Sequence, residues 1–100
     1  MNPVLSRHQS EDGSEETYQF WCPGCKCLHC ARTKGKQGPI WEWNGSMDKP
    51  TFSPSILYHG VEGHRPRCHI FVRDGRIEFC SDSAHELAGK TVDMTAIRDI

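Results

Sequence analysis

The sequence predicts a small, mainly β domain of the α+β class, built from antiparallel hairpins with one short helix and stapled by zinc. Three observations support this fold class. Short aromatic and β-branched runs alternate with turns rich in Gly, Pro and Asn. Six of the 100 residues are cysteine and six are histidine, and the hydrophobic fraction, cysteines included, is only 36%. A core this thin is typical of domains that need a metal or a disulfide.

The overall composition argues against several function classes. No apolar run approaches the roughly 18 residues of a membrane span, so we expect no contact with a membrane. No basic and then apolar leader is visible, so nothing in the sequence argues for secretion. The formal net charge is −1, which removes the simplest argument for a nucleic-acid-binding domain.

Residues 1–16 are predicted to form a disordered tail ahead of a single domain over residues 17–100. The tail is rich in Ser, Asp and Glu, and its only apolar pair is Val4 and Leu5. Such a segment buries too little apolar surface to offset the entropy lost on ordering.

Four segments after the tail are predicted to be extended. The third of them meets the turn dipeptide Asn44-Gly45, and the fourth contains Pro54, which favours an edge or a bulge because proline lacks an N–H group. The four segments are residues 17–21, 28–33, 40–43 and 51–58.

The strongest local signal is a hairpin at Asp74-Gly75, flanked by strands over residues 67–72 and 77–80. In this register Val72 faces Ile77 and Ile70 faces Phe79. Cys68 then lies on the core face of the sheet, whereas His69 lies on the opposite face and across from Cys80.

Beyond the hairpin we expect one short helix and one strand. Ser81 or Ser83 could cap a helix over residues 84–87, with Gly89 as its stop. Residues 91–94 are predicted to form the last strand.

Cys22-Pro23-Gly24-Cys25 is the sharpest motif in the chain, because this spacing forms a zinc knuckle in which backbone N–H groups point at the sulfurs. The sequence favours a structural zinc ion here. A disulfide would need an oxidising compartment, and a redox-active CxxC is typical of a thioredoxin-like βαβ context that this pattern lacks.

Two pairings could complete the zinc site. Either Cys68 joins His85, or His69 joins Cys80 across the hairpin. We favour Cys22, Cys25, Cys68 and His85, because Cys68 shares the face on which the knuckle should pack. Cys27 and Cys30 are interpreted as thiols that do not bind the ion. His29 is interpreted either as a residue that contacts a ligand rather than the ion, or as a surface residue.

A catalytic alternative uses His69, Asp82 and His85, with a metal ion, in a hydrolase or nuclease. Asp82 is adequately explained as a helix cap, however, so catalysis is the second choice.

Trp41, Trp43, Lys34 and Lys36 are candidates for contact with a partner. The two tryptophans lie two residues apart on one face and, if they are not core, could form an aromatic platform. The lysines belong to a locally basic loop that could contact phosphates, which keeps nucleic acid as a possible partner.

Taken in order, the motifs resemble a family of small uncharacterised proteins of bacteriophages and prophages. Members are often labelled ammonia monooxygenases, a label that 100 residues without a recognisable copper or di-iron set do not support. The resemblance implies a phage origin and the host cytoplasm, and it matches the family pattern at Cys22, Cys25, Cys68, His69, Asp82 and His85. The motifs that carry it are residues 20–25, 41–45, 50–57, 68–75 and 82–92.

The leading functional hypothesis from the sequence is therefore a zinc-stapled β domain that acts as a binding module, with a host protein as its expected partner. The rivals are the metal-dependent hydrolase or nuclease and the nucleic-acid-binding module.

Overall fold

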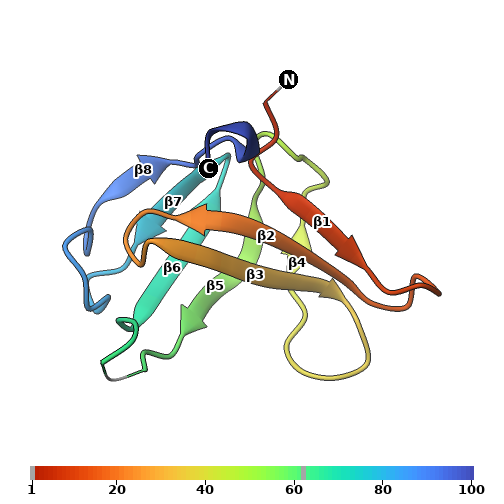
Figure 1. Cartoon of the computed structure of the whole chain (residues 1–100), viewed down its shortest axis with the longest axis horizontal. Coiled ribbons are helices and arrows are strands. Elements are labelled where there is room, and N and C mark those ends of the chain that lie inside the picture. Colours follow the sequence, from red (N-terminus) through yellow and green to blue (C-terminus); the bar gives the residue numbers. More distant parts are fainter. Residues whose placement is uncertain (1, 62) are drawn as a thin grey trace.

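The computed structural model describes residues 2–61 and 63–100, and its strands form two antiparallel sheets (Figure 1). The mainly β class is therefore confirmed. The first sheet has the order β1-β2-β3 and comprises β1 (Ser6–Gln9), β2 (Glu16–Cys22) and β3 (Cys27–Lys34). The second has the order β4-β5-β6-β7-β8 and comprises β4 (Glu42–Trp43), β5 (Phe52–Tyr58), β6 (Cys68–Arg73), β7 (Arg76–Phe79) and β8 (Thr91–Asp93).

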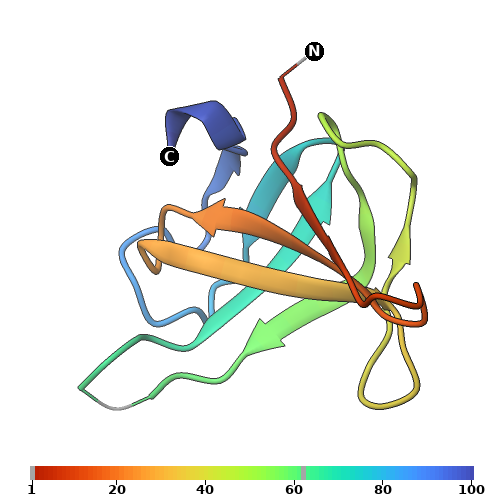
Figure 2. The ribbon, with the colours of Figure 1, turned by 45° about the vertical axis from the view of Figure 1, so that its right-hand side comes forward.

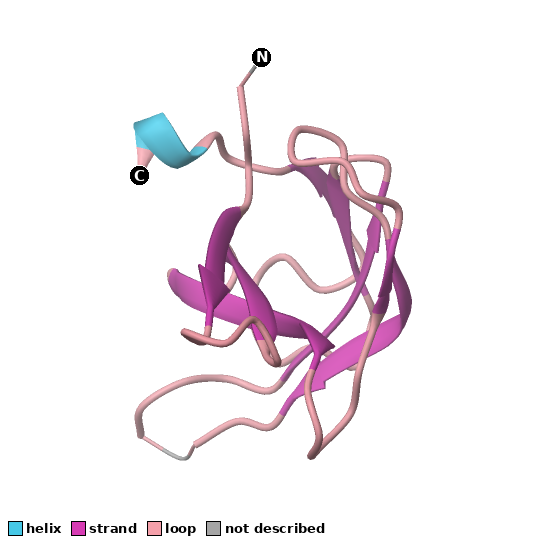
Figure 3. Ribbon diagram, turned by 90° about the vertical axis from the view of Figure 1, so that its right-hand side faces the viewer, coloured by secondary structure: helices cyan, strands magenta, loops and turns pink. Residues whose placement is uncertain are grey.

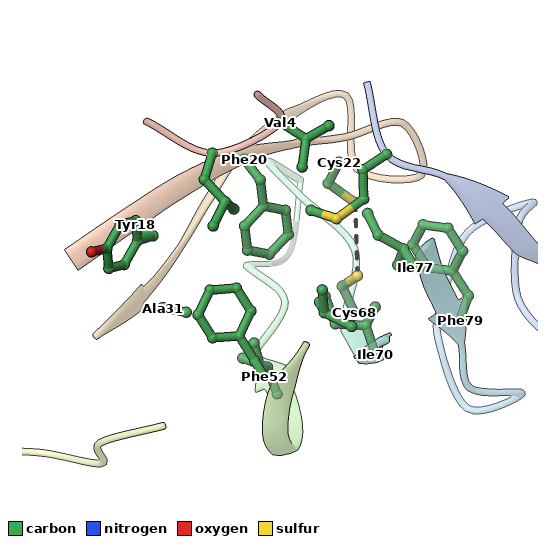
Figure 4. Packing of buried hydrophobic residues seen from close by; sticks show 14 residues of the cluster. Val4, Tyr18, Phe20, Cys22, Ala31, Phe52, Cys68, Ile70, Ile77 and Phe79 are labelled. Carbon is green, nitrogen blue, oxygen red and sulfur yellow. Dashed lines mark hydrogen bonds between the residues drawn. The ribbon is translucent and has the colours of Figure 1, made fainter. Parts of the chain in front are cut away.

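The two sheets lie face to face, with β2 and β3 crossing over the strands of the second sheet (Figures 2 and 3). Alternate residues of each sheet point into the space between them and form one core (Figure 4). Sheet one contributes Tyr18, Phe20, Cys22 and Ala31, and sheet two contributes Phe52, Ile56, Cys68, Ile70, Val72, Ile77 and Phe79.

The β6–β7 hairpin has the register that the sequence predicts. Val72 pairs with Ile77 and Ile70 pairs with Phe79. The turn residues Asp74 and Gly75 have φ angles of 49° and 76°, the left-handed conformation that an Asp-Gly hairpin turn requires. Cys68 is consequently buried between the sheets, and His69 lies on the outer face of β6.

The prediction of a short helix over residues 84–87 is wrong, because the structure has turns there. Its backbone bonds, Ala88 N–H to His85 O and Lys90 N–H to Leu87 O, span only three residues each and do not continue as an α-helix. The helical element in the described part of the chain is a single 3₁₀ turn, η1 (Ile97–Asp99). Among the described residues, no helix has the length and apolarity needed to cross a membrane.

The segment for which the sequence predicts disorder contains β1 in the structure. Val4 and Leu5 are 6% and 2% exposed and join the core, and β1 pairs with β2 from Ser6 to Gln9. The Ile97 N–H group donates to the Pro3 carbonyl, which ties the two ends of the chain together. A thin core gains enough from two more aliphatic side chains to offset part of the ordering entropy.

Replacing Leu5 with alanine should lower the free energy of unfolding by about 2–5 kcal/mol, because its buried side chain leaves a cavity. Urea unfolding measures this change, with Leu28→Ala as the matched control. Leu28 is 46% exposed, so its loss should cost no more than about 0.5 kcal/mol. Equal small effects of both substitutions would mean that the segment is a tail in solution.

Candidate functional site

The turn between β2 and β3 forms the knuckle that the Cys22-x-x-Cys25 motif predicts. Lys26 N–H donates to the Cys22 carbonyl at 2.7 Å, which closes the turn. The Cys25 N–H group points at Cys22 Sγ at 3.4 Å. Lys26 has a φ of 57°, so the chain reverses sharply and enters β3 at Cys27. The knuckle therefore holds its two sulfurs on one side of the turn.

Four potential metal ligands meet between the sheets: Cys22, Cys25, His29 and Cys68. Their ligand atoms all lie within 4.8 Å of one another. The contact between Cys22 Sγ and Cys68 Sγ, at 3.9 Å, joins the two sheets (Figure 4). Three sulfurs and one imidazole nitrogen are a donor set that suits a tetrahedral ion such as zinc. All six cysteines are free thiols, so this cluster, which we call the thiol cluster, could hold a metal ion.

Charge in the thiol cluster is unevenly distributed when no cation is present. The hydrogen bond from Cys68 lowers the pKa of Cys22 to about 4 and raises the pKa of Cys68. Burial raises the pKa of Cys25 to about 12, and the Cys22 charge acts in the same direction. A bound cation would stabilise all three thiolates and release their protons.

Two histidines lie near the knuckle, and each has an unsatisfied nitrogen. Within the described part of the chain, Nε2 of His29 and Nε2 of His85 are buried without a hydrogen-bond partner. His29 belongs to the thiol cluster, whereas the sequence interpretation left it outside the ligand set and favoured His85. His29 stacks on Tyr58, with ring centroids 3.8 Å apart, and the inward alternation of His29 with Ala31 on β3 is the signal that could have identified it.

His85 packs beside the knuckle but outside the thiol cluster. A Cβ atom at Gly24 would lie 2.3 Å from the His85 ring, so only glycine permits this approach. His85 Nδ1 accepts the Leu87 N–H group at 3.2 Å. The role of His85 as a zinc ligand stays a prediction. Cys27 and Cys30 also lie outside the thiol cluster.

A second group of polar side chains lies on the outer face of the second sheet. Ser55 Oγ is 3.1 Å from His69 Nε2, and Asp82 Oδ1 is 3.1 Å from His69 Nδ1. The three side chains form a continuous Ser–His–Asp chain, which we call the triad. Sequence reasoning identified His69 and Asp82 as functional candidates but did not identify Ser55.

A bulge in β5 presents Ser55 to His69. Phe52 pairs with Val72 and Ile56 pairs with Ile70, so three residues of β5 lie opposite a single residue of β6. Of the edge or bulge expected at Pro54, the structure has the bulge, which is flanked by the buried Phe52 and Ile56. The Trp41 indole N–H donates to the Ser55 carbonyl at 3.3 Å and fixes the backbone there.

Ser83 and Arg67 hold the other two members of the triad. The buried Ser83 hydroxyl accepts the His69 N–H at 3.1 Å and donates to the His69 carbonyl at 3.0 Å. Arg67 donates to Asp82 Oδ2 at 3.0 Å. This hydrogen bond, helped by His69, keeps the pKa of Asp82 below its usual range. The carboxylate is therefore ionised and oriented at neutral pH.

The triad geometry determines what its histidine can do. An ionised Asp82 accepts the Nδ1–H of His69 and thereby favours the tautomer in which Nε2 carries a lone pair. That lone pair faces the Ser55 hydroxyl and can take its proton. The side chains of His69 and Asp82 are 28% and 47% exposed, so a substrate can approach from solvent.

Cys80 joins His69 and Asp82 in a group whose ligand atoms also lie within 4.8 Å of one another. The alternative pairing of His69 with Cys80 therefore comes together in space, on the face of β6 opposite the thiol cluster. His85 belongs to neither of these two groups of described residues.

The candidate partner-binding residues lie between the end of β3 and β4. Trp43 packs against Tyr18 with ring centroids 4.4 Å apart, and its indole N–H donates to the Ser46 carbonyl. Trp41 and Trp43 are half-buried and line a shallow hollow with Ile40. Lys34 and Lys36 are exposed at and beyond the end of β3. Binding of a partner by these residues stays a prediction.

Comparison with known proteins gives one family. A family model described as "Bacterial ubiquitination-like system serine protease (BubE)" matches residues 3–80. This segment contains Ser55 and His69, and Asp82 follows just after it. No curated protein and no solved structure gives a significant match. The phage origin that the motifs suggest stays a prediction. Because the matched segment is most of the sequence, the chain belongs to the BubE family of bacterial ubiquitination-like systems.

Proposed function

We propose that this chain is a serine hydrolase that cleaves a peptide-type bond in a bacterial ubiquitination-like system. Ser55 is the nucleophile, His69 is the general base and acid, and Asp82 orients His69. The observation that carries the proposal is the hydrogen-bonded chain from Ser55 Oγ through both nitrogens of His69 to Asp82. The family description, which names a serine protease, supports the same class of reaction.

The proposed reaction proceeds in two halves. Ser55 Oγ attacks the substrate carbonyl carbon while its proton passes to His69 Nε2. The tetrahedral intermediate collapses, the C–N bond breaks, and His69 gives the proton to the leaving amine. Water then attacks the acyl-Ser55 ester, giving one proton to His69, and Ser55 regains a proton as the acid product leaves. Asp82 stays ionised throughout and stabilises the imidazolium.

Zinc in the thiol cluster would be structural in this scheme. The cluster offers four protein ligands, which is typical of a closed site, and it lies on the face of β6 opposite the triad. The structural zinc ion inferred from the sequence therefore remains part of the proposal. The metal-dependent hydrolase is replaced by a serine mechanism that uses two of its three residues, His69 and Asp82.

A protein substrate is compatible with the open position of the triad on a sheet face. The host protein expected as a partner could be such a substrate. Nucleic-acid binding through the basic loop and the cytoplasmic location stay predictions.

Ser55→Ala should abolish hydrolysis, with a fall in kcat on the order of 10⁴-fold or more, because no other group replaces the nucleophile. A fluorophosphonate probe tests the same point without knowledge of the substrate. Ser55 Oγ displaces fluoride from phosphorus, and mass spectrometry locates the adduct. His69→Ala should reduce labelling to a similar extent.

Ser53→Ala is the matched control, because the exposed Ser53 lies in the same bulge of β5 but, among the described residues, its side chain makes no hydrogen bond to the triad. It should label at the rate of the unmodified chain. Labelling of Ser53, or equal labelling of Ser55→Ala and the unmodified chain, would contradict the proposal.

Zinc analysis of the purified chain should give about one ion per chain. Cys68→Ser should lose this ion and His69→Ala should keep it, because the two residues point to opposite faces of β6. Chelation should unfold the domain, as followed by circular dichroism. Cys30→Ser, on an exposed cysteine, serves as the control and should keep its zinc. A folded, zinc-free chain would overturn the structural role.

A further inference from the structure

We propose that His69, Cys80 and Asp82 form a second metal site, through which a zinc-like divalent ion reversibly inhibits the hydrolase. This inference rests on the proposed function, because two of the three ligands are members of the triad. The site differs from the thiol cluster in its residues, in its position on the outer face of β6 and in its access to solvent.

The three ligands converge from different segments of the chain. His69 lies on β6, and Cys80 directly follows β7, where its N–H group donates to the His69 carbonyl at 2.8 Å. Asp82 lies two residues further on and reaches back to His69 Nδ1 at 3.1 Å. Ser83, which bonds both backbone groups of His69, fixes this loop against β6. The arrangement is therefore held by backbone hydrogen bonds as well as by side chains.

The chemistry of the three ligands suits a borderline transition metal rather than calcium or magnesium. An imidazole nitrogen, a thiolate and a carboxylate oxygen are all zinc ligands. Arg67 donates to Asp82 Oδ2, so Oδ1 is the oxygen that would bind an ion, in place of its hydrogen bond from His69 Nδ1. Three protein ligands leave one position for water, and the Arg67 guanidinium opposes a further cation. We therefore expect binding that is weaker than in the thiol cluster and reversible.

Occupation of this site would remove the general base. An ion that takes the Nδ1 lone pair displaces the proton from that nitrogen, and the neutral ring then carries its proton on Nε2. The Nε2–H group donates to Ser55 Oγ and can no longer accept the hydroxyl proton. An ion that binds Nε2 instead takes up the lone pair that would otherwise accept the Ser55 proton. In both cases Cys80 releases its thiol proton to solvent and Ser55 stays a neutral alcohol.

The test is fluorophosphonate labelling of Ser55 in the full chain at buffered concentrations of free Zn²⁺, with the thiol cluster already loaded. Labelling of the unmodified chain should fall at least tenfold and recover when the free Zn²⁺ is lowered again. Cys80→Ser should need about tenfold or more Zn²⁺ for the same effect, because it lacks one ligand. Cys30→Ser, which keeps the site, should behave like the unmodified chain.

A second readout separates failure of this inference from failure of the proposed function. Co²⁺ added to the zinc-loaded chain should give a thiolate-to-cobalt absorption band that is absent in Cys80→Ser. Labelling of Ser55 that does not respond to Zn²⁺ would overturn the inhibitory site and leave the proposed function standing. A band dependent on Cys80 in a chain that never labels at Ser55 would contradict the proposed function and the inhibition, but it would support the metal site.

Discussion

The structure depends on the alternation of side chains along β6. Cys68 points between the sheets, where its sulfur lies 3.9 Å from Cys22, and the next residue, His69, points outward to Ser55 and Asp82. A strand cannot turn both residues to one face, so the thiol cluster and the triad necessarily lie on opposite faces of the sheet. Anchoring Cys68 in the thiol cluster therefore also fixes the backbone from which His69 projects.

The rest of the fold brings distant segments to this strand. The β5 bulge supplies Ser55, the loop after β7 supplies Asp82, and Trp41 on the approach to β4 fixes the bulge. The knuckle between β2 and β3 supplies two sulfurs from the other sheet. The core has few aliphatic residues, so hydrogen bonds such as those of Ser83 contribute to the stability of the domain, and an ion bound by the thiol cluster would add to it.

The sequence predicts those features that depend on neighbours along the chain. Asp74-Gly75 fixes the hairpin register, and this register places Cys68 and His69 on opposite faces before any tertiary structure is known. Ser55 could not be found in this way, because its distance from His69 depends on a bulge that changes the β5–β6 pairing. Alternation along β3 could place His29 on the inward face, but its position beside Cys68 depends on the non-local packing of the two sheets. Residues 84–87 form turns in spite of the cap and stop residues on either side, and His85 packs against the knuckle there.

We infer that Asp82 holds His69 with its proton on Nδ1 and its lone pair facing Ser55. Nitrogen-15 NMR of the His69 ring in the zinc-loaded chain tests this claim most directly. We expect a protonated Nδ1 with a slowly exchanging, downfield proton resonance, an unprotonated Nε2, and loss of that resonance in Asp82→Asn. A neutral His69 ring protonated at Nε2, unchanged by Asp82→Asn, would contradict it.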